Sequence, residues 1–306
     1  MAVYANQING KLIRNVATVC SEIIFGNDIA IPLTSNIGRS GFFSRNVIRW
    51  QPFAFTIDTS KGDGSNIFEF PVQFTTAGAK PAVCTVDWGD GTIDQINSGA
   101  TPTQNPASHT YGAPGTYTIR LGHYIINGAP TSGVNNNRAQ FSFDWNITGA
   151  NLGITGYAAK IISVDYFGPF FNTEAAHLSN FAGCTNLLSV GTDSPQGRHR
   201  FSPPNPSFTG SQLYFTAMFK DASQFDQDLG AWDISYLVDA AGMFDNSGLS
   251  TANYDALLNG WAAQSTINSG VALGAAGINY TTATSGAAHT LLTGTYGWTI
   301  TDAGGI

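Results

Sequence analysis

The strongest constraint on this chain is a phrase that occurs twice in its second half. Met218-Phe219 recurs as Met243-Phe244, 25 residues further along the sequence. Units of this length cannot bury their apolar side chains alone, so neighbouring units must stack into one continuous core. We therefore expect a short solenoid. The side chains expected inside it are Phe219, Phe225, Leu229, Trp232, Ile234 and Phe244, with Cys184 as a further core residue.

A helix is expected to close the open end of this stack. Tyr254, Leu257, Leu258 and Trp261 follow the i, i+3, i+4, i+7 spacing of an amphipathic helix. Ser250 precedes them at the position of an N-cap. Trp261 is therefore counted among the expected core residues.

The first half of the chain shows a different periodicity. Apolar and polar residues alternate along residues 53–57, 68–72, 116–121 and 141–145, which is the pattern of half-buried strands. Turn residues lie between these stretches, and charged residues make up only 11 % of the chain. This composition favours short strands in a β-sandwich and argues against a coiled coil.

One turn in this half has a distinctive sequence. Val86-Asp-Trp-Gly-Asp-Gly-Thr92 is followed by His109-Thr-Tyr111 and then by Pro114-Gly-Thr-Tyr117. Trp88 is expected in the core, with Tyr117 packed against it and Asp90-Gly91 forming a hairpin turn. Asp87 and Asp90 have two interpretations, a calcium site or a pair of turn caps, and capping is the favoured one.

These residues resemble the polycystic-kidney-disease (PKD) domain family over residues 55–148. The family pattern usually has a Trp just before its Asp, where this chain has Val86. The resemblance implies an immunoglobulin-like sandwich.

The second half closely resembles the BspA-like leucine-rich-repeat family of bacterial surfaces, over residues 158–306. The matching phrases are Phe181-Ala-Gly-Cys-Thr-Asn-Leu187, Phe225-Asp-Gln-Asp-Leu229 and Trp232-Asp-Ile-Ser235, with residues 248–261 and 297–302 as a terminal cap. Two positions depart from the family, because Thr281 and His289 stand where Cys and Arg are common. Both families that the chain resembles occur in extracellular adhesion proteins.

The expected fold class is therefore mainly β. It begins with an N-terminal arm (1–50), followed by an Ig-like, PKD-like sandwich (51–148), a linker (149–157) and a short leucine-rich-repeat solenoid with an α-helical C-terminal cap (158–306).

Charge is unevenly distributed along the chain. Residues 201–306 carry Lys220 and eight aspartates, whereas residues 1–50 carry five basic residues against Glu22 and Asp28. The basic residues are the candidate anchoring residues Lys11, Arg14, Arg39, Arg45 and Arg49. We expect the arm to dock on other proteins or on copies of this chain, with no nucleic-acid binding and no membrane insertion.

Reactive side chains form no recognised catalytic pattern. The five histidines are scattered, and the three cysteines show no CxxC spacing. Asp226, Asp228 and Asp233 form a carboxylate cluster that could serve glycoside hydrolysis or calcium binding, but acids in repeats more commonly line turns. We expect no catalytic, cofactor-binding or metal-binding residues and no enzymatic activity.

The function expected from this sequence is that of a structural or adhesion protein displayed on a surface. The first residues lack the pattern of a secretory signal, which favours a phage virion component, of capsid-decoration or tail-fibre type, released by lysis. Its arm would anchor it on the virion surface, and its repeats would bind a host glycan or protein. The alternatives are a bacterial cell-surface adhesin or non-catalytic carbohydrate-binding module, which would be extracellular, and a hydrolase that uses Asp226, Asp228 and Asp233.

Overall fold

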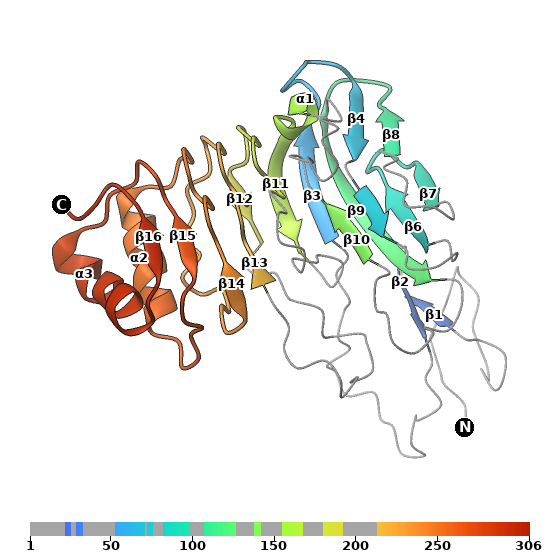
Figure 1. Ribbon diagram of the computed structural model, residues 1–306. Coiled ribbons are helices and arrows are strands. Elements are labelled where there is room, and N and C mark those ends of the chain that lie inside the picture. The colour runs from blue at the N-terminus through green and yellow to red at the C-terminus, as the bar shows by residue number, and fades with distance from the viewer. Residues whose placement is uncertain are drawn as a thin grey trace, which may run out of the picture. The chain divides into compact units, whose positions relative to one another are not determined.

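A computed structural model describes residues 22–25, 29–32, 53–70, 72–75, 82–97, 107–126, 138–141, 155–167, 180–191 and 213–306 (Figure 1). The chain forms two compact units, Met1–Gln51 and Pro52–Ile306. The described residues of the first unit are two antiparallel strands, β1 (Glu22–Phe25) and β2 (Ile29–Pro32). The candidate anchoring residues Lys11, Arg14, Arg39, Arg45 and Arg49 lie outside the described residues.

The fold is mainly β. The strands of the second unit are β3 (Phe53–Asp58), β4 (Ile67–Phe70), β5 (Val72–Thr75), β6 (Ala82–Asp87), β7 (Ile93–Asn97), β8 (Ala107–Thr110), β9 (Thr116–Ile126), β10 (Arg138–Phe141), β11 (Ile161–Tyr166), β12 (Ser189–Val190), β13 (Leu213–Tyr214), β14 (Leu237–Asp239), β15 (Ala272–Gly274) and β16 (Thr299–Thr301). The helical elements are α1 (Thr155–Ala158), α2 (Thr251–Ala262), α3 (Thr282–Thr290) and the π-helical turn η1 (Leu291–Thr295).

Six strands form the largest sheet, in the order β12-β11-β3-β9-β6-β7. All neighbours in it are antiparallel except β11 and β12, which are parallel. Phe55 lies opposite Ile119 on one side and Val164 on the other, and all three side chains are buried. This row defines the inner face of the sheet. Two further antiparallel pairs, β4 with β8 and β5 with β10, belong to the same half of the chain.

The expected strands over residues 53–57 and 116–121 correspond to β3 and β9. The stretch expected as one strand over residues 68–72 is divided between β4 and β5. The stretch expected over residues 141–145 meets β10 only at Phe141, and residues 142–145 lie outside the described residues.

The six-stranded sheet continues past the linker expected at residues 149–157. β11 and β12 lie beyond that linker in the sequence, yet β11 pairs with β3 along Ile161 to Tyr166. Residues from both sides of the expected linker also share one hydrophobic core. A strand added to a sheet edge buries apolar side chains and satisfies backbone groups together, so the two halves form one compact unit.

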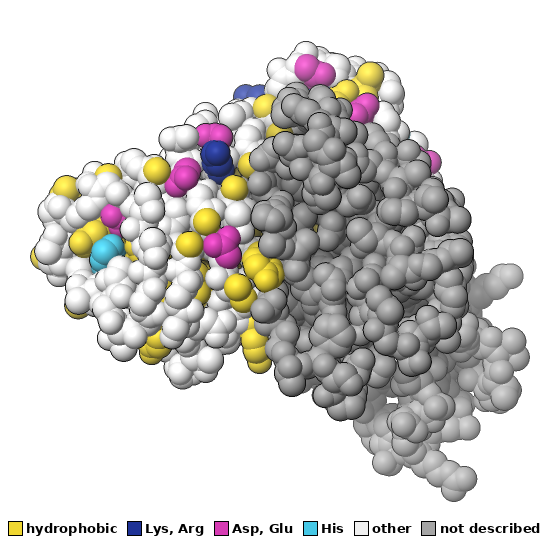
Figure 2. Space-filling view, viewed as in Figure 1, with side chains coloured by type: hydrophobic (Ala, Val, Ile, Leu, Met, Phe, Trp, Pro, Cys, Tyr) yellow, Lys and Arg dark blue, Asp and Glu magenta, His cyan; other side chains and the backbone are white. Residues whose placement is uncertain are grey.

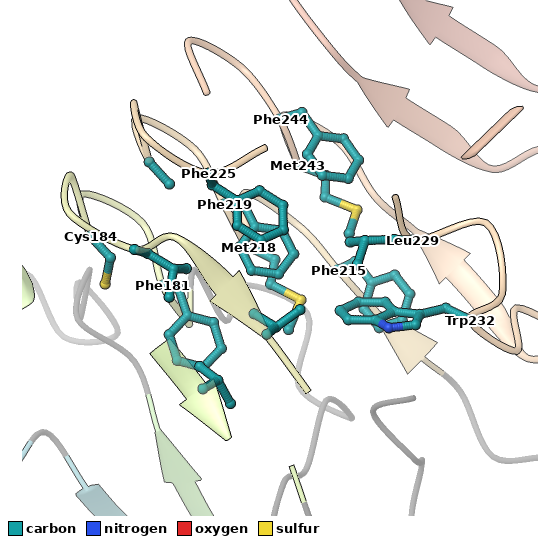
Figure 3. Packing of buried hydrophobic residues seen from close by; sticks show 14 of the residues in the cluster. Phe181, Cys184, Phe215, Met218, Phe219, Phe225, Leu229, Trp232, Met243 and Phe244 are labelled. Carbon is teal, nitrogen blue, oxygen red and sulfur yellow. The ribbon is translucent and has the colours of Figure 1, made fainter. Parts of the chain in front are cut away.

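After β12 the chain makes turns that stack on one another in parallel. The backbone N–H of Phe181 donates to the carbonyl of Met218, and that of Phe219 donates to Met243, each at 2.9 Å. The phenyl rings follow the same order: Phe219 stacks between Phe181 and Phe244, with ring centroids 6.0 and 5.9 Å apart (Figure 3). One aromatic residue thus recurs at the equivalent position of successive turns. Parallel pairs β13–β14 and β15–β16 follow on the strand side.

The structure places most of the expected core residues inside the protein. Those with no more than 2 % of their surface exposed are Trp88, Cys184, Phe219, Phe225, Leu229, Trp232, Ile234, Phe244 and Trp261. Figure 3 shows several of them packed together in the stacked turns. Burial raises the pKa of the Cys184 thiol well above its usual value, so this side chain behaves as a small apolar core residue.

The predicted helix with Ser250 as its N-cap is confirmed as α2. The hydroxyl of Ser250 accepts a hydrogen bond from the backbone N–H of Asn253 at 3.3 Å, which is the N-cap geometry. All four residues of the predicted stripe are buried, and they are Tyr254, Leu257, Leu258 and Trp261. The indole N–H of Trp261 donates to the carbonyl of Leu229 at 3.0 Å, which fixes the helix on the preceding turn.

Helix α2 comes close to the turn that contains Leu229 at two glycines, Gly260 of the helix and Gly230 of the turn. A Cβ atom on Gly260 would lie 2.4 Å from the carbonyl oxygen of Gly230, which is backbone and cannot swing away. We predict that Gly260→Ala destabilises the protein by about 1–3 kcal/mol because the helix must shift. The urea unfolding midpoint measures this effect.

Gly294→Ala is the matched control for that substitution. Gly294 also lies in a helical segment, but nothing stands within 4 Å of its Cβ position. Its replacement should leave the midpoint unchanged or raise it, because alanine is the better helix former. Equal midpoints for the two variants would show that the close approach of α2 does not limit stability.

Candidate functional site

The turn between β6 and β7 is stabilised by its two carboxylates. One carboxylate oxygen of Asp87 accepts the backbone N–H of Gly89 at 2.9 Å. One oxygen of Asp90 accepts the backbone N–H of Thr92 at 3.0 Å and the Thr92 hydroxyl at 2.6 Å. Both side chains therefore have the geometry of turn caps, which is the favoured interpretation of the sequence.

A group of stacked rings lies beneath this turn. The imidazole of His109 lies parallel to the Trp88 indole at 4.9 Å and meets Tyr111 edge-on at 4.6 Å. Tyr117 stacks on Tyr111 at 3.9 Å. The sequence prediction that Tyr117 packs against Trp88 is therefore corrected. His109 occupies that place, and Tyr117 lies partly buried one ring further out because its hydroxyl donates to the carbonyl of Ala113 at 2.8 Å.

An ion pair joins the turn to β8. His109 Nε2 lies 2.7 Å from a carboxylate oxygen of Asp90, and the two side chains are 13 % and 19 % exposed. Burial opposes ionisation of Asp90, but hydrogen bonds from Thr92 and His109 outweigh it and lower the pKa of Asp90 to about 2. The sequence analysis missed this role because it treated His109 as one of five scattered histidines. Its position in the phrase His109-Thr-Tyr111 was the available signal.

The three aspartates of the hydrolase alternative act as local hydrogen-bond acceptors. Asp226 accepts the N–H of Ser250 at 2.8 Å and the Asn253 amide at 2.7 Å, Asp228 accepts the N–H of Gly230 at 2.7 Å, and Asp233 accepts the N–H and hydroxyl of Ser235 at 2.9 and 2.6 Å. Burial opposes ionisation of Asp226, but the bonds from Ser250 and Asn253 outweigh it and lower the pKa of this carboxyl. These contacts hold successive turns and the start of α2 in place.

Lys160 is a buried cation that the sequence did not indicate. Its side chain is fully buried, and its ammonium group lies 2.6 Å from a carboxylate oxygen of Asp63. It also donates to the carbonyl oxygens of Ser65 and Ile67, the latter at 3.0 Å, and lies over the Tyr157 ring. A buried ammonium group with this many acceptors is satisfied. Lys160 therefore fixes residues 63–67 against β11.

One face of the large sheet carries a connected set of half-buried polar groups, here called the hydroxyl row. The Thr56 hydroxyl lies 3.0 Å from that of Thr118 and donates to Asp165 at 2.8 Å. Ser163 donates to the other oxygen of Asp165 at 3.0 Å. Successive side chains of a strand point to opposite faces, so this row lies opposite the buried Phe55. The row crosses β9, β3 and β11 and offers hydroxyl and carboxylate groups on rigid strands.

The described part of the chain contains neither a cluster of metal ligands nor a membrane-spanning helix. Among these residues, no three His, Cys, Asp or Glu side chains gather into a group that could hold a metal ion. No helix in the described segments is long and apolar enough to cross a membrane.

Comparison with known protein families gives one match. A family model described as "Mycoplasma protein of unknown function, DUF285" matches residues 208–279. The matched range contains the turns that begin at Met218 and Met243, together with α2. The chain is similar to that family over these residues, which make up less than half of its length. No curated protein and no solved structure was found to match.

The Asp90–His109 pair predicts a specific response to acid. The pKa of Asp90 falls from 3.8 to about 2 on folding. Its stabilising effect is therefore complete above pH 3.8 and is lost as the pH falls through about 2. Asp90→Asn should lower the free energy of unfolding by about 1 kcal/mol at neutral pH. The difference from the unaltered protein should shrink as the pH falls from 3.8 and vanish below about pH 2, and urea unfolding across this pH range measures it.

Asp87→Asn provides the control for this measurement. Asp87 belongs to the same turn, but its ion-pair partner is Arg120, at 3.7 Å. If the loss of unfolding free energy in Asp90→Asn stays constant from neutral pH to about pH 2, the proposed role of the ionised carboxylate is contradicted.

Proposed function

We propose that this chain is a non-enzymatic structural or adhesion protein that is displayed on a surface. In this proposal residues 51–148 form a PKD-like immunoglobulin-type sandwich, and residues 158–306 form a short BspA-like leucine-rich-repeat solenoid with a helical cap. The parallel hydrogen bonds between turns support the solenoid, as does the phenylalanine column of Phe181, Phe219 and Phe244. The buried face of the six-stranded sheet supports the sandwich.

The observation that carries the proposal is how the chain uses its polar groups. The acidic side chains considered for catalysis cap turns of the backbone, whereas the half-buried hydroxyl row lies on the face of the sheet opposite Phe55. Polar groups held on rigid elements suit recognition of a partner surface. This division favours a scaffold that binds over one that performs chemistry.

The proposed location is the surface of a phage virion, as a capsid-decoration or tail-fibre component. The basic residues of the first 50 positions would anchor the chain to other virion proteins or to copies of itself. The acidic repeat region would then face a host glycan or protein. The uneven charge along the chain supports this orientation, because opposite charges on two ends favour different neighbours.

Limited proteolysis with mass spectrometry tests this function on the isolated chain and on particles from its source. We expect cleavage within residues 1–50 of the isolated chain and protection of these residues on particles. Recovery of the chain from cell envelopes rather than from particles would favour the bacterial adhesin instead.

A charge-removal variant tests the anchor. In this variant Lys11, Arg14, Arg39, Arg45 and Arg49 are all replaced by Gln. It should lose attachment to particles, and attachment of the unaltered chain should weaken as salt screens its charges. Lys220→Gln is the control because it removes a positive charge from the repeat region. Loss of attachment in the control alone would place the anchor elsewhere.

A further inference from the structure

A groove lies on the cap, over helix α3 and the π-helical turn η1. It is a shallow depression that opens widely to solvent, with a volume of about 550 Å³. Side chains that line it are Tyr280, Thr282, Ala287, Thr290, Leu291 and Thr295. In Figure 2, the end of the molecule that α3 forms shows mainly uncharged side chains.

The chemistry of this groove is neutral and amphipathic. α3 and η1 contain no Asp, Glu, Lys or Arg. The hydroxyl of Thr290 donates to the carbonyl of Gly286 at 2.8 Å, so its oxygen lone pairs remain available as acceptors. Ala287 and Leu291 are exposed and supply an apolar strip between the threonines.

Gly286 forms part of the groove, although packing does not require a glycine there. A Cβ atom at this position would lie 3.5 Å from the nearest atom, a methyl group of Thr282, which is ordinary contact. Glycine inside a helix is less stable than alanine. Gly286 therefore weakens α3 without a packing reason, and its effect is to keep the groove deeper at this point.

The wall beside Gly286 is also irregular. α3 ends in η1, where the backbone N–H of Tyr296 donates to the carbonyl of Leu291 at 3.3 Å. Such π-helical turns are rare and occur frequently at functional sites. The Tyr280 ring is held on the other side by stacking on His289, with centroids 4.5 Å apart. Both walls of the groove are thus fixed in position.

We propose that this groove binds one ring of a neutral glycan. The hydroxyls of Thr282, Thr290 and Thr295 would exchange hydrogen bonds with sugar hydroxyls. The apolar strip of Ala287 and Leu291 would contact the C–H groups of the ring. This inference rests on the proposed function, because it names the ligand class that the displayed protein recognises.

A pair of alanine-to-phenylalanine variants tests the site. Ala287 and Ala283 are both exposed on α3, but only Ala287 lines the groove. The probes are the methyl glycosides of glucose, galactose, mannose and N-acetylglucosamine, titrated against the full chain by NMR. We expect at least one glycoside to bind. Ala287→Phe should weaken it by at least about tenfold, equivalent to about 1.4 kcal/mol, and Ala283→Phe should leave it unchanged.

Two results would overturn the glycan site. One is that no glycoside binds the unaltered chain, and the other is that both phenylalanine variants bind as it does. The particle-attachment experiment does not depend on this groove, so attachment without glycoside binding would reject the site and leave the display function standing. Glycoside binding without attachment to particles would reject the display function and leave the glycan site standing.

Discussion

The structure depends on the stacking of one aromatic position through successive turns. The Phe219 ring lies nearly parallel to those of Phe181 and Phe244, at 11° and 16°. A second ring, Phe225, packs on Phe219 at 4.3 Å from within the same turn. Turns this short have no inner layer of their own, so each depends on its neighbours for a dry interior. The backbone hydrogen bonds of Phe181 with Met218 and of Phe219 with Met243 follow the same order of turns as this column.

Buried polar contacts join the two helices α2 and α3. The buried carboxylate of Asp255 on α2 accepts the N–H of Thr281 at 2.8 Å and the hydroxyl of Ser285 at 2.5 Å. These bonds join the two helices. Burying a carboxylate is unfavourable unless it is fully hydrogen-bonded, so Asp255 also fixes the start of α3. The two helices are therefore joined by buried polar contacts, and Trp261 holds α2 on the turn that contains Leu229.

The sequence predicted the parts of this fold in which local pattern and packing agree. The spacing of the apolar residues within 254–261 predicted α2, because this spacing alone identifies the buried face of a helix. Trp88 was correctly placed near a tight turn, but Tyr117 was paired with the wrong ring. The alternation of apolar and polar residues shows which side chains point into the core. The order in which rings pack in the core depends on which strands are neighbours. The ion pair of Asp90 with His109 was hidden for the same reason, since 19 positions separate the two residues.

Lys160 and the continuity of the sheet were beyond sequence reasoning. Lysine is almost never fully buried, so no pattern within residues 155–167 indicates that Lys160 is enclosed. Its burial requires acceptors from residues 63–67, almost a hundred positions earlier. Those acceptors are in reach only because β11 pairs with β3. The buried lysine and the shared sheet are therefore one feature, in which a single strand bonds the first half of the unit to the stacked turns.

Two glutamine side chains bond to the backbone at points where backbone pairing is interrupted. The side-chain amide of Gln227 accepts the N–H of Val190 at 2.7 Å and donates to its carbonyl at 3.0 Å. Gln264 does the same for Ile234 and Trp232, at 3.0 and 2.6 Å. An amide side chain carries the same donor and acceptor as a peptide unit, so it can replace a missing strand neighbour. Gln227 thus satisfies both backbone groups of Val190 at the β12 edge of the six-stranded sheet.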